Sequence, residues 1–107
     1  MSTIYISGPM TGYPDHNYPK FMRVESYLRK NFSWLRVVNP ATLHGPGEHR
    51  REDCLRRDVR ALCDCTHIYM LTGWHQSAGA KLELDVATAL GLTVVFESED
   101  ELAKLER

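Results

Sequence analysis

The sequence lacks a hydrophobic run long enough to span a bilayer, and residues 1–7 do not have the pattern of a signal peptide. We therefore expect a cytoplasmic protein with no membrane partner. An excess of charge of one sign is also missing, because 13 Lys and Arg residues stand against 14 Asp and Glu residues, for a formal net charge of −1. This balance gives no reason to expect a nucleic-acid polymer as a partner.

Cysteine is scarce, with three residues at positions 54, 63 and 65. The odd number and the spacing do not form a disulfide framework, so we expect reduced, mostly buried thiols. Cys63, Cys65 and His67 are separated by single residues, whereas structural zinc sites usually have two to four residues between cysteines. We therefore expect no metal. A G-x-G-x-x-G motif is absent as well, which disfavours a reductase that binds NAD.

Hydrophobic residues make up 43% of the 107 residues, which is enough for one core, and residues 1–107 are expected to form a single domain. Short β-rich runs alternate with segments of helical periodicity. The expected strands cover residues 3–7, 34–38, 67–72 and 92–96. The expected helices cover residues 51–63, residues 78–90 and a segment that includes Phe21, Val24, Leu28 and Phe32, with a short terminal helix after Glu99.

Details of these elements can also be predicted. Asn17 is expected to cap the first helix, and residues 41–49 are expected to form a loop. In the third helix, we expect residues 82, 86 and 90 to face the core. Leu84 would then lie on the polar side, where an exposed leucine would mark a subunit contact.

Strands that alternate with helices predict parallel strands joined by right-handed crossovers. The fold class is therefore α/β, a three-layer α/β/α sandwich with a four- to five-stranded parallel sheet, flavodoxin-like or Rossmann-like. Ligands in such folds bind at the carboxyl ends of the strands. Those ends are predicted at residues 8–12, 39–47, 73–77 and 97–99.

Glu83 is the most informative residue of the chain. On a helix its neighbours one turn away are small or apolar, at Gly79, Ala80, Val86 and Ala87. A carboxylate on such a flank is unfavourable unless it binds or reacts with something. Glu83 is therefore the first candidate for a catalytic residue.

Asp58 is a second carboxylate that borders an apolar helix face, next to Leu55 and Leu62. Two carboxylates from different helices near the strand ends fit a nucleophile and a general acid at a sugar carbon. An ion pair between Asp58 and a neighbouring arginine explains the position equally well. Tyr5, on the first strand, has a phenol group that could orient a carboxylate, although a buried structural tyrosine is the commoner case.

Two loops offer candidate binding residues. A glycine loop after the first strand lets backbone N–H groups approach an anion, although a tight turn would need the same glycines. The start of the third helix is another candidate anion site, and there Ser77 also fits a helix cap. The candidate binding residues are Gly8, Pro9, Met10, Thr11, Gly12, Ser77 and Gly79.

Two further candidates lie at strand ends. Asn39 closes the second strand at the edge where ligands are expected, so we count it among the substrate-binding residues. Trp74 follows the third strand, where an aromatic ring can stack on a base; a core anchor is at least as good an interpretation.

Together these motifs resemble the nucleoside 2-deoxyribosyltransferase family and its relatives that hydrolyse the N-glycosidic bond of 2′-deoxynucleoside 5′-monophosphates. The segments that carry the resemblance are Thr3-Ile4-Tyr5 with Ser7-Gly8-Pro9-Met10, then Asp58 with Cys63-Asp64, and finally Ser77-x-Gly79-x-x-x-Glu83-Leu84. The resemblance covers the chain from Ile4 to about Val95.

The resemblance implies a role for each matching residue. Glu83 would attack C1′ and form a glycosyl-enzyme, Asp58 would protonate the departing base or hold a sugar hydroxyl, and Tyr5 would orient Glu83. Ser77 is similar to the phosphate-binding serine of the nucleotide hydrolases, which favours a 5′-phosphorylated substrate. Thr11 is a departure, because the nucleotide hydrolases look basic at this loop.

The expected function is therefore hydrolysis or base exchange at the N-glycosidic bond of a (deoxy)nucleoside 5′-monophosphate. No cofactor is expected, because the carboxylate supplies the nucleophile. The expected partners are a small-molecule nucleotide or nucleoside and further copies of the chain, since a small domain gains core and site completion by pairing. The alternative is a non-catalytic nucleotide-binding or sensing module of the same fold.

Overall fold

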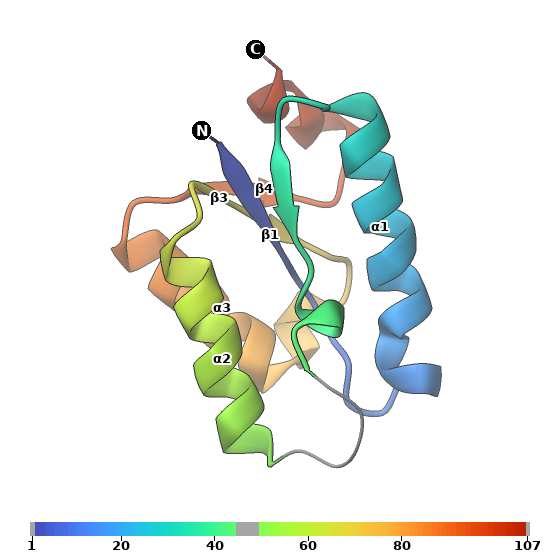
Figure 1. The fold of residues 1–107 in the computed structure, drawn as a ribbon. Coiled ribbons are helices and arrows are strands. Elements are labelled where there is room, and N and C mark those ends of the chain that lie inside the picture. The colour runs from blue at the N-terminus through green and yellow to red at the C-terminus, as the bar shows by residue number, and fades with distance from the viewer. Residues whose placement is uncertain (1, 45–49, 107) are drawn as a thin grey trace.

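The computed structural model describes residues 2–44 and 50–106 and has the expected alternation of strands and helices (Figure 1). The strands are β1 (Thr3–Ser7), β2 (Arg36–Val38), β3 (His67–Met70) and β4 (Thr93–Phe96). The α-helices are α1 (Tyr18–Asn31), α2 (Arg51–Cys63) and α3 (Ala78–Ala89). Short 3₁₀ helices are η1 (Pro14–Asn17), η2 (Pro40–Thr42), η3 (Trp74–Gln76) and η4 (Glu99–Leu105). Of the loop expected at residues 41–49, residues 45–49 lie outside the described residues.

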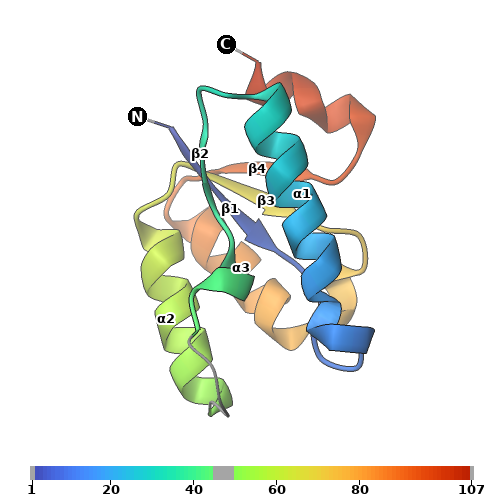
Figure 2. The ribbon, with the colours of Figure 1, turned by 45° about the vertical axis from the view of Figure 1, so that its right-hand side comes forward.

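The four strands form one parallel sheet in the order β2-β1-β3-β4, which confirms the predicted α/β class. In the register of the sheet, Tyr5 of β1 lies beside Val38 of β2 and Ile68 of β3. α1 covers one face of the sheet, and α2 and α3 cover the other (Figures 1 and 2). The strand order reverses between β1 and β3, and such a switch point is where open parallel sheets bind ligands.

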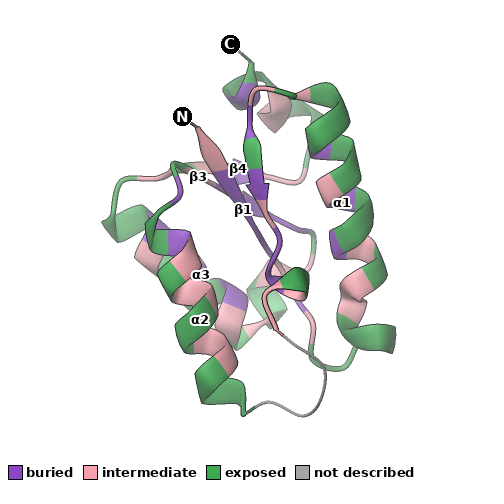
Figure 3. Cartoon of the chain, viewed as in Figure 1, coloured by how far each residue is buried: buried purple, intermediate pink, exposed green. Residues whose placement is uncertain are grey.

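Each face of the sheet has its own core, and the central strands β1 and β3 are mostly buried (Figure 3). On β1, Ile4 and Ile6 point to the α1 side, whereas Tyr5 points to the side of α2 and α3. This alternation follows from the two-residue period of a strand. It places one face of β1 directly beneath α3.

Of the three residues predicted to face the core from α3, Val86 packs against it, but the prediction was wrong for Leu82 and Leu90. Leu82 and Leu90 are 41% and 54% exposed, whereas Ala80 and Ala87 are buried against the sheet. Leu84, predicted on the polar side, packs against the core of the α2 and α3 side. Apolar residues lie on more than one flank of this helix, and the packing selects the flank with small side chains, which brings α3 close to the strands.

The predicted capping role of Asn17 was also wrong. Asn17 precedes α1 with a left-handed backbone (φ 63°), and its side chain makes no capping hydrogen bond. Instead its Nδ2 donates to the carbonyl of Pro9 at 2.9 Å. This bond ties the loop after β1 to the start of α1.

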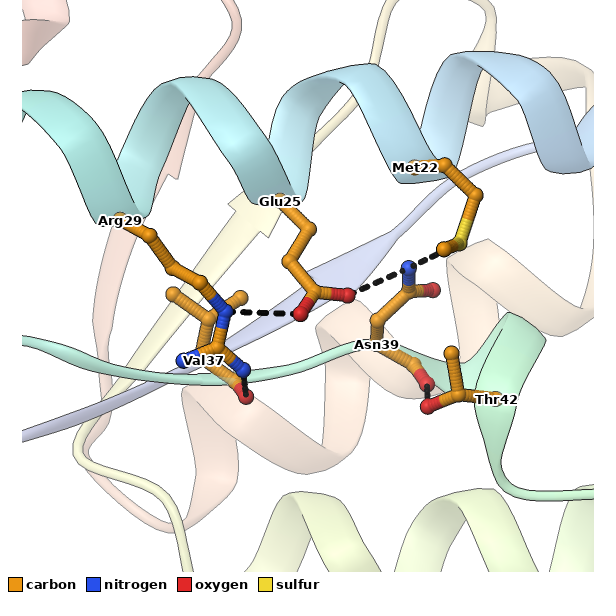
Figure 4. Close-up of polar contacts among 6 residues, drawn as sticks. All are labelled: Met22, Glu25, Arg29, Val37, Asn39 and Thr42. Carbon is orange, nitrogen blue, oxygen red and sulfur yellow. Dashed lines mark hydrogen bonds and ion pairs between the residues drawn. The ribbon is translucent and has the colours of Figure 1, made fainter.

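β2 is a short edge strand that polar side chains connect to α1 (Figure 4). The buried Asn39 donates through Nδ2 to Glu25 Oε1 at 3.0 Å and to Met22 Sδ at 3.3 Å, and its Oδ1 accepts from the N–H of Ala41. Glu25 in turn accepts from Nε of Arg29 at 2.7 Å. The amide of Asn39 is therefore committed to holding β2, η2 and α1 together.

Within the described residues, the helices are all too short or too polar to cross a bilayer.

Candidate functional site

A cleft of about 510 Å³ opens at the carboxyl end of the sheet, next to the switch point between β1 and β3. Its volume lies in the range of small-molecule sites. The loop after β1, the first two turns of α2 and the start of α3 form its walls. Most of the candidate site residues line it: Gly8, Pro9, Met10, Thr11, Asp58, Ser77, Gly79 and Glu83.

Glu83 lies in this cleft and is only 6% exposed. Tyr5 donates its hydroxyl to Glu83 Oε2 at 2.6 Å, and Ser7 donates its hydroxyl to Oε1 at 2.7 Å. Each carboxylate oxygen therefore accepts one short hydrogen bond from β1. The small residues of α3 make this approach possible, because they allow the helix to pack close to the strand.

The electrostatics of the group follow from this geometry. Burial raises the pKa of Glu83 above its ordinary value, and the hydroxyls of Tyr5 and Ser7 oppose that rise. Burial, together with the nearby Glu83 and Asp58 carboxylates, raises the pKa of Tyr5 well above 10. Tyr5 therefore keeps its proton and acts only as a donor, which favours the ionised form of Glu83.

Asp58 has a different environment. Burial, with a further contribution from the Glu83 charge, raises its pKa from 3.8 to about 7, while Arg57 opposes the rise. Its Oδ1 is fully buried and accepts no hydrogen bond from the described part of the chain. Nε2 of His44 lies 3.1 Å from Oδ1, but without the alignment of a hydrogen bond. The cleft thus holds two carboxyl groups in different environments: two hydroxyl donors favour the anion of Glu83, and the pKa of Asp58 lies near neutral pH.

The cleft wall at α3 begins with a capped helix. Ser77 Oγ accepts from the N–H of Ala80 at 3.1 Å, so the capping interpretation of Ser77 is confirmed. Ala78 and Gly79 line the cleft in the first turn. The early N–H groups of a helix have no partners within that helix, and they favour a negative group beside them.

Gly8 is needed for close packing of β1 on the segment that follows β3. A Cβ atom at this position would lie 2.7 Å from Cβ of Leu71, which is closer than such atoms approach. The glycine is therefore required by close packing and not by a left-handed turn, and the loop borders the cleft.

Three candidate binding residues are not among those that line the cleft. Asn39 is 2% exposed and is used in the contacts with α1. Trp74 packs on Phe96, with ring centroids 5.8 Å apart, as a core anchor would. Gly12 has an exposed, left-handed backbone (φ 86°) in the turn beyond the cleft.

Sequence reasoning missed Ser7 as a site residue, although a signal was present. Ser7 lies two residues after Tyr5 on a strand, so both side chains share a face. Cys54 was also missed; with Arg51 and Asp58 it forms one stripe of α2 that faces the cleft. Arg57, on the same helix, contacts Nδ1 of His44 through Nη1 at 3.0 Å.

The cysteines are free, with Cys65 buried, Cys54 half-buried and Cys63 exposed, so the expectation of mostly buried thiols holds only in part. In the described ranges no three His, Cys, Asp or Glu side chains come together as a metal site would require.

The fold and the cleft define a class: a parallel α/β protein with a hydrogen-bonded carboxylate at the switch point of its sheet. The chain belongs to the family described as "Domain of unknown function (DUF4406)", whose model matches residues 2–96. Among curated proteins, no sequence matches significantly.

Two solved structures have a similar fold. The "2-desoxiribosyltransferase from Leishmania mexicana" superposes with a TM-score of 0.68 at 22% identity, over 90% of this chain and 63% of that one. A "conserved protein from Enterococcus faecalis V583" superposes with a TM-score of 0.73 at 20% identity, over 98% of this chain and 72% of that one. The chain thus spans less than two thirds of the transferase, and at these identities the likeness shows the fold alone.

Proposed function

We propose that this protein cleaves or exchanges the N-glycosidic bond of a (deoxy)nucleoside 5′-monophosphate, with Glu83 as the nucleophile. The observation that carries the proposal is the buried carboxylate of Glu83, held by two hydroxyl donors within a cleft of ligand size. One of the proteins with the same fold is named as a 2-desoxiribosyltransferase, and this name supports the same class of chemistry.

The two carboxyl groups of the cleft have complementary roles in this proposal. A Glu83 oxygen forms a bond to C1′ while the bond from C1′ to the base nitrogen breaks, and Asp58 gives its proton to that nitrogen. In the second step, Asp58 accepts a proton from water or from an acceptor base, which attacks C1′ and releases Glu83. Two displacements at one carbon retain its configuration. The carboxylate is the nucleophile, so the proposed chemistry needs no metal or organic cofactor.

In this proposal, the phosphate of the substrate binds at the start of α3. The N–H groups of Ala78 and Gly79 and the hydroxyl proton of Ser77 are donors on that side of the cleft. Arg51 lines the cleft from α2. We propose that Arg51 supplies the positive charge that the loop after β1, with Thr11, does not provide.

Base release from a panel of deoxynucleoside and ribonucleoside 5′-monophosphates and their nucleosides tests the proposal, with and without an acceptor base. Glu83→Gln keeps the size of the side chain and removes the nucleophile, so release is expected to fall by at least about 10³-fold while nucleotide binding remains. Glu52→Gln, on the exposed side of α2, is the matched control and is expected to keep the wild-type rate.

The outcomes separate the candidates. Release from phosphates alone supports the proposed substrate class, and release only with an acceptor base assigns the protein as a transferase. If nothing in the panel releases a base but nucleotides still bind, the non-catalytic binding module replaces the proposal.

A further inference from the structure

We infer that the contacts of His44 with Arg57 and Asp58 determine which oxygen of Asp58 carries the catalytic proton. The inference rests on the proposed function of Asp58 as the acid, and it concerns two residues outside the cleft lining. It starts from two contacts of one imidazole ring. Nε2 of His44 faces Asp58 Oδ1 at 3.1 Å, and Nδ1 faces Nη1 of Arg57 at 3.0 Å.

The contact with Arg57 selects the tautomer of His44. A guanidinium group has only donors, so Nδ1 must accept and cannot carry a proton. The neutral ring then carries its proton on Nε2, the nitrogen that faces Asp58. A doubly protonated ring would place two N–H groups against each other. Arg57 therefore fixes His44 as a donor that points toward the acid.

The donor in turn distinguishes the two oxygens of Asp58. Oδ1 is buried and faces the N–H of His44, so a proton on Oδ1 would compete with that N–H. The proton of the carboxyl group accordingly belongs on Oδ2. Because Asp58 lines the cleft while Oδ1 is closed off from solvent, Oδ2 is the oxygen that remains to face a substrate.

During the reaction the same arrangement stabilises the product of proton transfer. When Oδ2 gives its proton to the departing base, the carboxylate that forms turns a full negative charge toward the His44 N–H, and the contact closes into a charge-assisted hydrogen bond. In the structure His44 Nε2 and Asp58 Oδ1 are not aligned as a hydrogen bond. This is consistent with a bond that forms during the reaction, since catalytic hydrogen bonds often tighten only when charge develops. His44 is thus a positioning residue that acts through Asp58.

Other charged and titratable groups also face Asp58 and enter any pH dependence. Glu83 on α3 and Tyr5 on β1 both interact electrostatically with Asp58. Arg51 and Cys54 lie earlier on the same face of α2. Among these neighbours and Arg57, the His44 N–H is the donor placed against Oδ1, so its removal has a distinct signature.

That signature is a shift of the pH–rate profile. His44→Leu removes the donor that favours ionised Asp58, so the acid holds its proton to higher pH. The basic limb of kcat/KM is expected to move upward by about one pH unit, and kcat is expected to fall about tenfold or more, as for the loss of one hydrogen bond to a charged group. His44→Gln, whose amide nitrogen can replace Nε2 as a donor, is expected to restore most of the rate and the wild-type limb.

A second measurement needs no turnover. The ¹⁵N shifts of the His44 ring report its tautomer directly, and we expect the Nε2-protonated form in the wild type. Arg57→Leu is expected to lower the share of the Nε2-protonated form. Arg56→Leu, at an exposed neighbouring position on α2, is expected to leave that share unchanged.

The two measurements distinguish a failure of this inference from a failure of the proposed function. An Nδ1-protonated ring or an imidazolium in the wild type at neutral pH overturns the inference, whether or not the protein is active. An active wild type whose rate and profile survive His44→Leu also overturns it and leaves the proposed function intact. If no substrate releases a base, the proposed function fails and with it the acid role of Asp58, whatever tautomer His44 adopts.

Discussion

Glu83 shows how a buried carboxylate is tolerated at the scale of single residues. Burial opposes its charge, and two hydroxyl groups from one strand offset that cost. The alternation of Tyr5 and Ser7 on β1 supplies both donors without any change in the backbone. A carboxylate that is held on both oxygens is also fixed in direction, which suits the proposed attack of Glu83 on one carbon.

Ser7→Ala tests this arrangement. The Ser7 bond favours ionised Glu83, so its loss raises the pKa of Glu83 further. The acid limb of kcat/KM, where Glu83 must lose its proton, is expected to move to higher pH, and the rate at neutral pH is expected to fall about 10-fold. Ser26→Ala, on the exposed side of α1, is the control. An unchanged acid limb in Ser7→Ala would show that this bond does not govern the nucleophile.

Asp58 is expected to make the folded protein less stable at neutral pH. Its pKa rises from 3.8 to about 7 on folding, so ionising it is disfavoured in the folded state, and the penalty grows as the pH rises from about 4 to 7. After allowance for solvent screening, Asp58→Asn is expected to raise the free energy of unfolding by about 1–3 kcal/mol at pH 8 and little at pH 4. Denaturant unfolding at both pH values measures this. Equal gains at both pH values, or a similar gain in the exposed Asp85→Asn, would contradict it.

At the scale of elements, α3 positions Glu83 by packing closely on the sheet. Ala80 and Ala87 are 2% and 0% exposed, one turn to either side of Glu83. Larger side chains there would lift the helix and lengthen the bonds that Glu83 accepts. The small residues of α3 therefore serve the site as well as the core.

Ala87→Leu is expected to overpack this interface. The added volume has no space at a fully buried position, so the free energy of unfolding is expected to fall by about 1–3 kcal/mol. Base release is expected to fall as well, because Glu83 moves away from β1. Ala89→Leu, exposed on the same helix, is the matched control for thermal unfolding and activity. Equal stability of the two variants would argue against close packing of α3.

The same helix separates what the sequence predicts from what it does not. Periodicity locates α3 within one residue of its end, and the apolar flank of Glu83 predicts the burial of that carboxylate correctly. Periodicity cannot choose between the flank with Leu82 and Leu90 and the flank with alanines, since that choice depends on distance to the sheet. The contact between His44 and Asp58 likewise joins a loop to a helix, and no local pattern encodes it.

For the whole molecule, the expected self-association stays a prediction, and we propose that copies of the chain contact each other through α3. Leu82 and Leu90 are among the most exposed large apolar side chains of the described residues, and they lie on the outer side of one helix. A twofold axis through Val86 would place Leu82 of one copy against Leu90 of the other. Lys81 would then lie near the partner helix's C-terminus, where a positive charge is favourable.

Sedimentation velocity over a range of concentrations measures this association. We expect the wild type to form dimers or larger assemblies, and Leu90→Lys to shift the protein toward the monomer, because a charge would replace the apolar contact. Thr88→Lys, an exposed position on the same helix, is expected to leave the assembly unchanged. A monomeric wild type, or assemblies indifferent to Leu90→Lys, would refute the placement.

The polar contacts between α1 and β2 have a consequence for behaviour at high concentration. Arg36 N–H pairs inward with the carbonyl of Ser2, so the polar groups of Val37 face the open edge of the sheet. Arg29, the residue that also holds Glu25, places Nη2 3.4 Å from the carbonyl of Val37. A bulky cation thus occupies the side on which another molecule's strand would add, and edges guarded in this way resist ordered aggregation. The contacts that hold β2 in place are therefore also a barrier to fibril growth.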